Sequence, residues 1–159
     1  MKESPWKPRP RRWSYSPGRQ AARRSRRSVR VARRWGAVSA SRLTLKTGAD
    51  GAPPHHHKLS HEAFYVLGGT MLFRLGDTLT TVGKGGLVVV PPGLPHVFGA
   101  ADGQEADVFV VLSPGIERFG YFEQLAAISR GEAEFDSLIP EQERYDVYFE
   151  SLPNWRSVT

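Results

Sequence analysis

The sequence predicts a mainly β fold, in which short strands close into a barrel or sandwich and one helix follows. Three observations predict it. About seven or eight short strand-like runs lie between residues 41 and 113, separated by turns rich in Gly and Pro. After Pro114-Gly115 the apolar spacing changes to steps of three and four residues. The first forty residues are strongly basic and have almost no aliphatic pattern. We therefore divide the chain into a basic arm (1–40), a β-barrel (41–113) and a C-terminal part (114–159).

The predicted strands follow one another between glycine and proline turns. Residues 41–47 alternate polar and apolar side chains, and the Gly and Pro residues between 48 and 54 end this strand. A hairpin is expected next, in which a strand over 62–67 turns at Gly68-Gly69 into a strand over 70–75. Further strands are expected at 78–82, 87–90, 96–98 and 107–113, with a stiff bend at 91–95.

The C-terminal part is predicted to hold an amphipathic helix and an aromatic tail. The helix ends near Gly131. Its apolar residues are Ile116, Phe119, Phe122, Leu125, Ala126 and Ile128. The tail offers a short helix starting at Pro140, and then Tyr145, Tyr148, Phe149 and Trp155. We expect both pieces to cover the barrel surface or an edge strand. A dimer contact or a wall of the pocket is the alternative.

The net charge of +6 sums two unlike parts of the chain. Residues 1–42 carry fourteen Lys and Arg against one acidic residue, Glu3, whereas residues 43–159 carry eight basic and fifteen acidic residues. The basic segment cannot bury enough apolar surface to offset the entropy of ordering it, so we expect residues 1–40 to be disordered.

Several interpretations of the arm stay open. It can be a tail for nucleic acid or another anionic surface, or an Arg-rich targeting peptide. It can also be functionally silent, or lie upstream of a true start at Val29, Val31 or Val38. No helix-turn-helix pattern is visible in it, and we expect no nucleic-acid partner.

Two absences limit the function classes. The chain has no cysteine, which excludes disulfides, thiolate zinc sites and a cysteine nucleophile. No apolar run reaches the roughly 20 residues of a membrane span. We therefore expect a cytoplasmic chain with no membrane partner.

The five histidines all lie between residues 55 and 96 and suggest a metal site. Residues two apart on a strand share a face, so His55 and His57 are expected to point into the barrel and His56 outward. Four residues separate His57 from Glu62, which is enough for a bend that returns the chain to the same centre. His96 is expected to reach this centre from a strand that is distant in the sequence. Three imidazoles and one carboxylate suit iron, manganese, nickel, cobalt, copper or zinc. Such a set also leaves coordination positions open for water, dioxygen or a chelating substrate.

Other interpretations of these residues exist. A run of histidines can be an incidental surface cluster. His61 competes with His57 as a ligand, although the strand alternation places it opposite Glu62, in an outer shell or on the surface. Seven apolar residues can line a pocket or simply form the core: Phe64, Val66, Phe73, Val88, Val90, Phe98 and Phe109.

Two segments resemble the sequence motifs of the cupin family. The first is the stretch from His55 to Glu62, with Gly69 after six further residues. The second is Gly85 with Pro91-Pro92-Gly93-Leu94-Pro95-His96. The resemblance covers residues 41–113. It implies a double-stranded β-helix, or jelly-roll barrel, that is usually dimeric and holds a single divalent metal ion on His55, His57, Glu62 and His96.

The resemblance also suggests a reaction. A lone barrel followed by Pro-Gly-Ile-Glu-Arg-Phe is similar to small bacterial cupins related to quercetin 2,3-dioxygenase. By that resemblance Glu62 would be both a ligand and the catalytic base, and the substrate a small aromatic or enolic metabolite. A non-redox cyclase, isomerase or decarboxylase, and a non-catalytic binding protein, remain alternatives.

Overall fold

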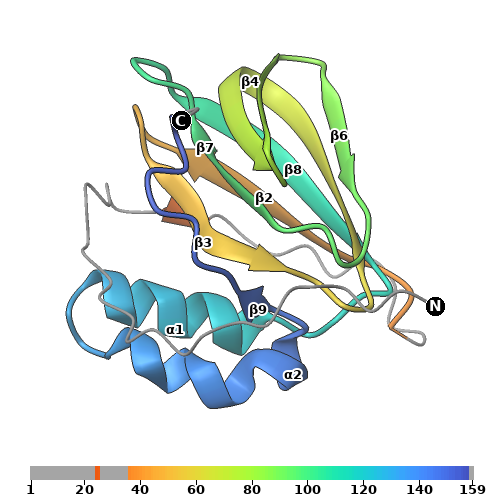
Figure 1. Cartoon of the computed structure of the whole chain (residues 1–159), viewed down its shortest axis with the longest axis vertical. Helices are drawn as coiled ribbons and strands as arrows, with labels where there is room; N and C mark the ends of the chain where they lie inside the picture. Colours follow the sequence, from red (N-terminus) through yellow and green to blue (C-terminus); the bar gives the residue numbers. More distant parts are fainter. Residues whose placement is uncertain (1–23, 26–35, 158–159) are drawn as a thin grey trace.

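The computed structural model describes residues 24–25 and 36–157 (Figure 1). The predicted mainly β class and the helix after it are confirmed. The predicted disordered arm lies outside the described residues, apart from 24–25 and 36–40. Strand β2 begins at Ser39, so the last two residues assigned to the arm belong to the barrel. The strands are β1 (Arg24–Ser25), β2 (Ser39–Leu45), β3 (Asp50–His56), β4 (His61–Leu75), β5 (Thr78–Gly83), β6 (Leu87–Val90), β7 (His96–Ala100), β8 (Ala106–Ser113) and β9 (Tyr148–Phe149).

The strands form two antiparallel layers that share β4. In the first layer the order is β1-β2-β8-β4-β6, and in the second it is β5-β4-β7-β3-β9. Figure 1 shows the two layers curling around a common interior, with the helices beside β3 and β9. The layers enclose an apolar core because alternate residues of each strand point inward.

The predicted hairpin at Gly68-Gly69 is wrong, because β4 is a single strand of 15 residues. Its first half pairs with β6 and β8, and its second half pairs with β5 and β7. The register slips between Val66 and Gly68, as in a β-bulge. Gly69 has φ +68°, and a Cβ there would overlap the carbonyl of Glu105. The glycine pair therefore bends the strand from one layer into the other and does not reverse it.

The predicted end of the strand over 41–47 is confirmed, because β2 ends at Leu45, but the sequence did not predict that the next strand, β3, runs from Asp50 through Pro53-Pro54 to His56. Its pairing with β7 shifts register between Asp50 and Ala52, and again between Ala52 and His55. These irregularities accommodate Pro53-Pro54, which have no N–H groups to give to the ladder. Gly51 is needed there because a Cβ would overlap the ring of Phe98.

In the C-terminal part, β9 pairs with β3 at the edge of the second layer. Helix α1 spans Phe119–Ser129, and the chain leaves it through Gly131 at φ +72°. A 3₁₀ helix, Phe135–Glu141, and α2, Gln142–Tyr145, replace the short helix expected from Pro140. The 3₁₀ helix starts before Pro140 because the buried side chains of Phe135 and Leu138 pack in an apolar cluster. That cluster consists of Tyr121, Leu125, Phe135, Leu138, Tyr145 and Val147.

The core contains all but one of the apolar residues that the sequence proposed for core or pocket. Phe109 is the exception, because Val108 and Val110 take the inward positions of β8 and leave it on the outer face. Among the helices in the described part of the chain, none is long and apolar enough to cross a membrane.

We predict that Gly69→Ala destabilises the barrel by about 2 kcal/mol or more, because alanine resists the left-handed backbone and its Cβ overlaps Glu105. Urea denaturation measures this free energy of unfolding. Gly83→Ala is the matched control, since its backbone is not left-handed and no atom lies within 4 Å of the added Cβ. Equal losses in both variants would contradict the role of Gly69.

Candidate metal centre

The structure brings together all four side chains that the sequence proposed as metal ligands. His55 ends β3, His57 follows it, Glu62 lies at the start of β4 and His96 begins β7. One nitrogen or oxygen atom from each lies within 4.8 Å of the others, and all four residues are buried. Because β3 and β7 are neighbours, His55 lies directly opposite His96 in the ladder.

The Nε2 atoms of the three histidines converge on one carboxylate oxygen. Glu62 Oε2 lies 3.0 Å from His57 Nε2, 2.9 Å from His96 Nε2 and 3.9 Å from His55 Nε2. Neighbouring ligands of an octahedral ion with bonds near 2.1 Å lie about 3 Å apart. The spacing therefore fits a small divalent ion.

The other nitrogen of each ring is held by a backbone carbonyl. A carbonyl only accepts, so each Nδ1 carries the hydrogen and donates it. The Nε2 of a neutral ring is then a lone-pair acceptor facing the site. The bonds join His55 Nδ1 to Pro53 O at 2.8 Å, His96 Nδ1 to Leu94 O at 2.9 Å, and His57 Nδ1 to Asp146 O.

This donor set is suited to a cation. Three lone pairs and a carboxylate oxygen would repel one another in a buried site unless a proton or a metal ion lies between them. The mix of imidazole and carboxylate fits a divalent transition metal and not calcium or magnesium. The residues present therefore fit the metal that the sequence predicts.

The electrostatics maintain one negative charge at the centre. Burial raises the pKa of Glu62, but hydrogen bonds to its Oε2 from His57 Nε2 and His96 Nε2, each made through a proton in the place of the metal ion, hold this pKa well below its usual value. Burial lowers the pKa of His55, and the neighbouring His96 and His57 lower it further. His55 therefore stays neutral, as a metal ligand must be.

The two remaining histidines lie outside the cluster. His56 points away from it, as expected, where its Nδ1 lies 2.7 Å from Glu150 Oε1 and its ring stacks on Tyr148. His61 is exposed, which confirms its predicted position opposite Glu62.

Asp146 is a supporting residue that the sequence analysis missed. Its carbonyl accepts from His57, and its carboxylate accepts from the backbone N–H groups of Lys58, Leu59 and Ser60. These bonds fix the loop that joins His57 to Glu62. Burial raises the pKa of Asp146, but these N–H groups offset it and lower the pKa overall. Nothing in the local sequence indicates this role, because the contacts span 86–89 residues.

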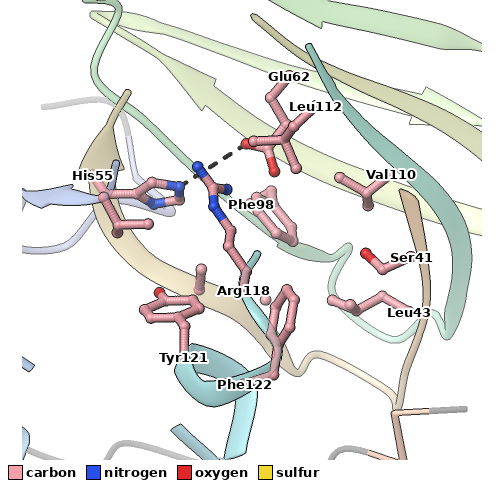
Figure 2. A pocket seen from close by; sticks show the side chains of 13 residues that line it. Ser41, Leu43, His55, Glu62, Phe98, Val110, Leu112, Arg118, Tyr121 and Phe122 are labelled. Carbon is pink, nitrogen blue, oxygen red and sulfur yellow. Dashed lines mark ion pairs between the residues drawn. The ribbon is translucent and has the colours of Figure 1, made fainter. Parts of the chain in front are cut away.

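Arg118 is a second residue that the sequence did not single out. It is 6% exposed, and its Nε donates to Tyr145 O at 2.9 Å and its Nη2 to Asp146 O at 3.2 Å. Burial lowers the pKa of Arg118, while Glu62 opposes this shift. Figure 2 shows its guanidinium reaching up from α1 toward His55 and Glu62.

A pocket leads to the centre between the strands and α1 (Figure 2). Together with the open solvent at its mouth it encloses about 410 Å³ of empty space. Glu62 and His55 face it from one side, and apolar side chains form most of the rest. The lining residues are Ser41, Leu43, Gly51, Ala52, His55, Glu62, Phe98, Val110, Leu112, Arg118, Tyr121, Phe122 and Val147.

The fold and the site together define a small jelly-roll barrel with a His₃Glu centre. The sequence profile of the Cupin domain matches residues 41–112, which contain all four candidate ligands. Residues 41–112 are thus a cupin domain, which makes up 72 of the 159 residues of the chain. The comparison with curated proteins found no match.

Solved structures, two of them described as cupins, resemble the chain at low sequence identity. The cupin domain of Schizosaccharomyces pombe Cnp3 matches with a TM-score of 0.50 and 17% identity, over 69% of this chain and 72% of that chain. KdgF from Halomonas sp. matches with a TM-score of 0.46 and 24% identity, over 50% of this chain and 72% of that chain. A cupin protein from Bacteroides fragilis matches with a TM-score of 0.47 and 18% identity, over 48% of this chain and 65% of that chain. At 17% identity the likeness to the Cnp3 domain concerns the fold alone.

We predict that Asp146→Ala destabilises the protein by about 2 kcal/mol, because the backbone N–H groups of residues 58–60, of which that of Ser60 is buried, lose a charged acceptor. Thermal and urea unfolding measure this loss. Asp77→Ala, at an exposed turn, is the control and should change stability little. Unchanged stability in Asp146→Ala would show that the 58–60 loop is held by other contacts.

Proposed function

We propose that this chain binds one divalent transition metal on His55, His57, Glu62 and His96 and is a small-molecule dioxygenase of the quercetinase-like type. The observation that carries the proposal is the convergence of three oriented imidazole nitrogens and one carboxylate at the end of an apolar pocket. The substrate is a small aromatic or enolic molecule, because the pocket walls are mostly apolar and the metal takes oxygen donors.

Each part of the site has a task in this proposal. A bound iron, manganese, nickel, cobalt or copper ion would supply positions for dioxygen and for the substrate oxygens. The carboxylate of Glu62 faces the pocket, so it can accept the proton of a substrate hydroxyl. Phe98 and Leu112 exclude water from the reacting group. The histidines keep their Nε2 lone pairs oriented through the carbonyls that hold Nδ1.

A non-redox enzyme is the second candidate, and one observation favours it. The positive charge of Arg118 in the same pocket would stabilise an enolate or another developing anion without any oxidant. Zinc at the site would then act as a Lewis acid for an isomerisation, cyclisation or decarboxylation. A barrel without metal would leave a non-catalytic binding protein.

The metal is tested by elemental analysis of the untagged full chain. We expect close to one equivalent of a transition metal in the wild type, and loss of it in a His55/His57/His96 triple-alanine variant. Glu62→Gln should retain metal poorly and abolish activity, whereas His56→Ala, the matched control, should retain both. Iron, manganese, nickel, cobalt or copper would support the oxygenase and zinc the second candidate. Equal metal content in wild type and triple variant would refute the site.

The same proposal includes a homodimer. It is supported by the outer face of the first layer, where apolar residues lie side by side on β6, β4 and β8. Tyr65, Leu87 and Val89 are 45%, 62% and 55% exposed there, a patch that suits a second copy of the chain. In light scattering coupled to size exclusion, a Leu87→Glu/Val89→Glu variant should shift from dimer to monomer. Thr81→Glu on exposed β5 should not. A monomeric wild type would contradict the dimer.

A further inference from the structure

Arg118 carries a buried positive charge that makes no direct ion pair in the described part of the chain, although Glu62 and Asp146 attract it from a greater distance. Its two hydrogen bonds go to the backbone carbonyls of Tyr145 and Asp146, which are neutral. Within residues 24–25 and 36–157, no carboxylate forms an ion pair with it. The carboxylate of Asp146 is occupied by the N–H groups of residues 58–60. Leaving a buried charge unpaired is costly, so this arrangement favours an anion that arrives with a ligand.

The guanidinium still has donors to offer. It carries five N–H groups, and the two hydrogen bonds described above use two of them. Its Nη1 makes no hydrogen bond to any residue that the structure describes. Nη2 also lies 3.1 Å from His57 Nδ1, but that nitrogen donates to Asp146 O, so the contact cannot be a hydrogen bond. Arg118 lines the pocket, where these donors can reach a ligand.

The charges of the filled site point the same way. A divalent ion paired with Glu62 leaves one positive charge at the centre, and Arg118 adds another beside it. Most of the remaining pocket is apolar, with Leu43, Phe98, Val110, Leu112 and Phe122 on its walls. A ligand that satisfies both features is an anion with an apolar body.

We infer that Arg118 is the anion-binding residue of this pocket and that the substrate is a small carboxylate with an aromatic or other flat apolar body. Its carboxylate lies on the guanidinium, and its other oxygen donors face the Glu62 side. The inference names the substrate class of the proposed enzyme, and it rests on that proposal for the role of the metal.

Calorimetric titration with benzoate and benzamide tests the inference, because the two probes share their shape and differ in charge. The full chain is titrated both metal-free and loaded with zinc. Wild type should bind benzoate about tenfold or more tightly than benzamide. In the metal-free protein, Arg118→Gln should lose this preference and Arg118→Lys should keep part of it. Arg130→Gln, at the exposed end of α1, should behave as wild type. Equal binding of the two probes, or a preference that persists in folded, metal-free Arg118→Gln, would overturn the inference.

A second measurement does not depend on how well the Arg118 variants fold. In metal-free protein the carboxylate of Glu62 opposes a ligand carboxylate, and it also attracts Arg118. Metal-free Glu62→Gln should therefore bind benzoate several-fold more tightly than metal-free wild type, with benzamide unchanged. Unchanged or weaker benzoate binding in this variant would count against Arg118 as the anion site.

The results separate this inference from the proposed function. An Arg118-dependent benzoate preference in a protein that takes up no metal would support the anion site and contradict the metal enzyme. One equivalent of bound metal with no carboxylate preference would support the metal enzyme and overturn the anion site.

Discussion

The site depends on holding four electron-rich atoms together inside the protein. Three Nε2 atoms lie 2.9–3.9 Å from Glu62 Oε2, in a place where water cannot screen them. Such an arrangement is stable only if the ring orientations are fixed and a cation compensates the repulsion. His55 and His96 meet the first requirement locally, since each ring bonds the carbonyl two residues before it. The prolines near His55 and His96 restrict the backbone of these segments. The facing strands β3 and β7 therefore hold the two rings in fixed orientations.

His57 is held differently, and this difference explains what the sequence could and could not predict. The spacing of the histidines and Glu62 predicted the whole cluster, because strand alternation and the two motifs are local signals. The carbonyl that orients His57 belongs to Asp146, 89 residues further on. Asp146 has φ 49° at the end of α2, a conformation that aspartate tolerates and that turns its backbone toward the loop. No short-range pattern announces such a contact.

The errors in the fold have a similar origin. Gly68-Gly69 between two strand-like runs is the same local signal whether the chain reverses or bends. Here β4 bends at these glycines and does not reverse. Its first half pairs with β8, and its second half pairs with β5 and β7. The sequence analysis likewise did not place Pro53-Pro54 in a strand, yet register shifts accommodate them within β3. In both places tertiary pairing outweighed local preference, whereas the well-patterned strands from Thr78 to Val90 came out as predicted.

The C-terminal segment changes how far family membership can inform function. The cupin profile ends at residue 112, so it includes the four candidate ligands but neither Arg118 nor Asp146. The first of these places a charge in the pocket, and the second fixes the loop between two ligands. The barrel therefore determines where a metal can bind, while the segment after it shapes what can bind beside the metal. Two cupins with identical ligands can thus differ in substrate through this segment alone. If the proposed enzyme is correct, the charge of Arg118 against the apolar walls of the pocket is the strongest structural constraint on its substrate.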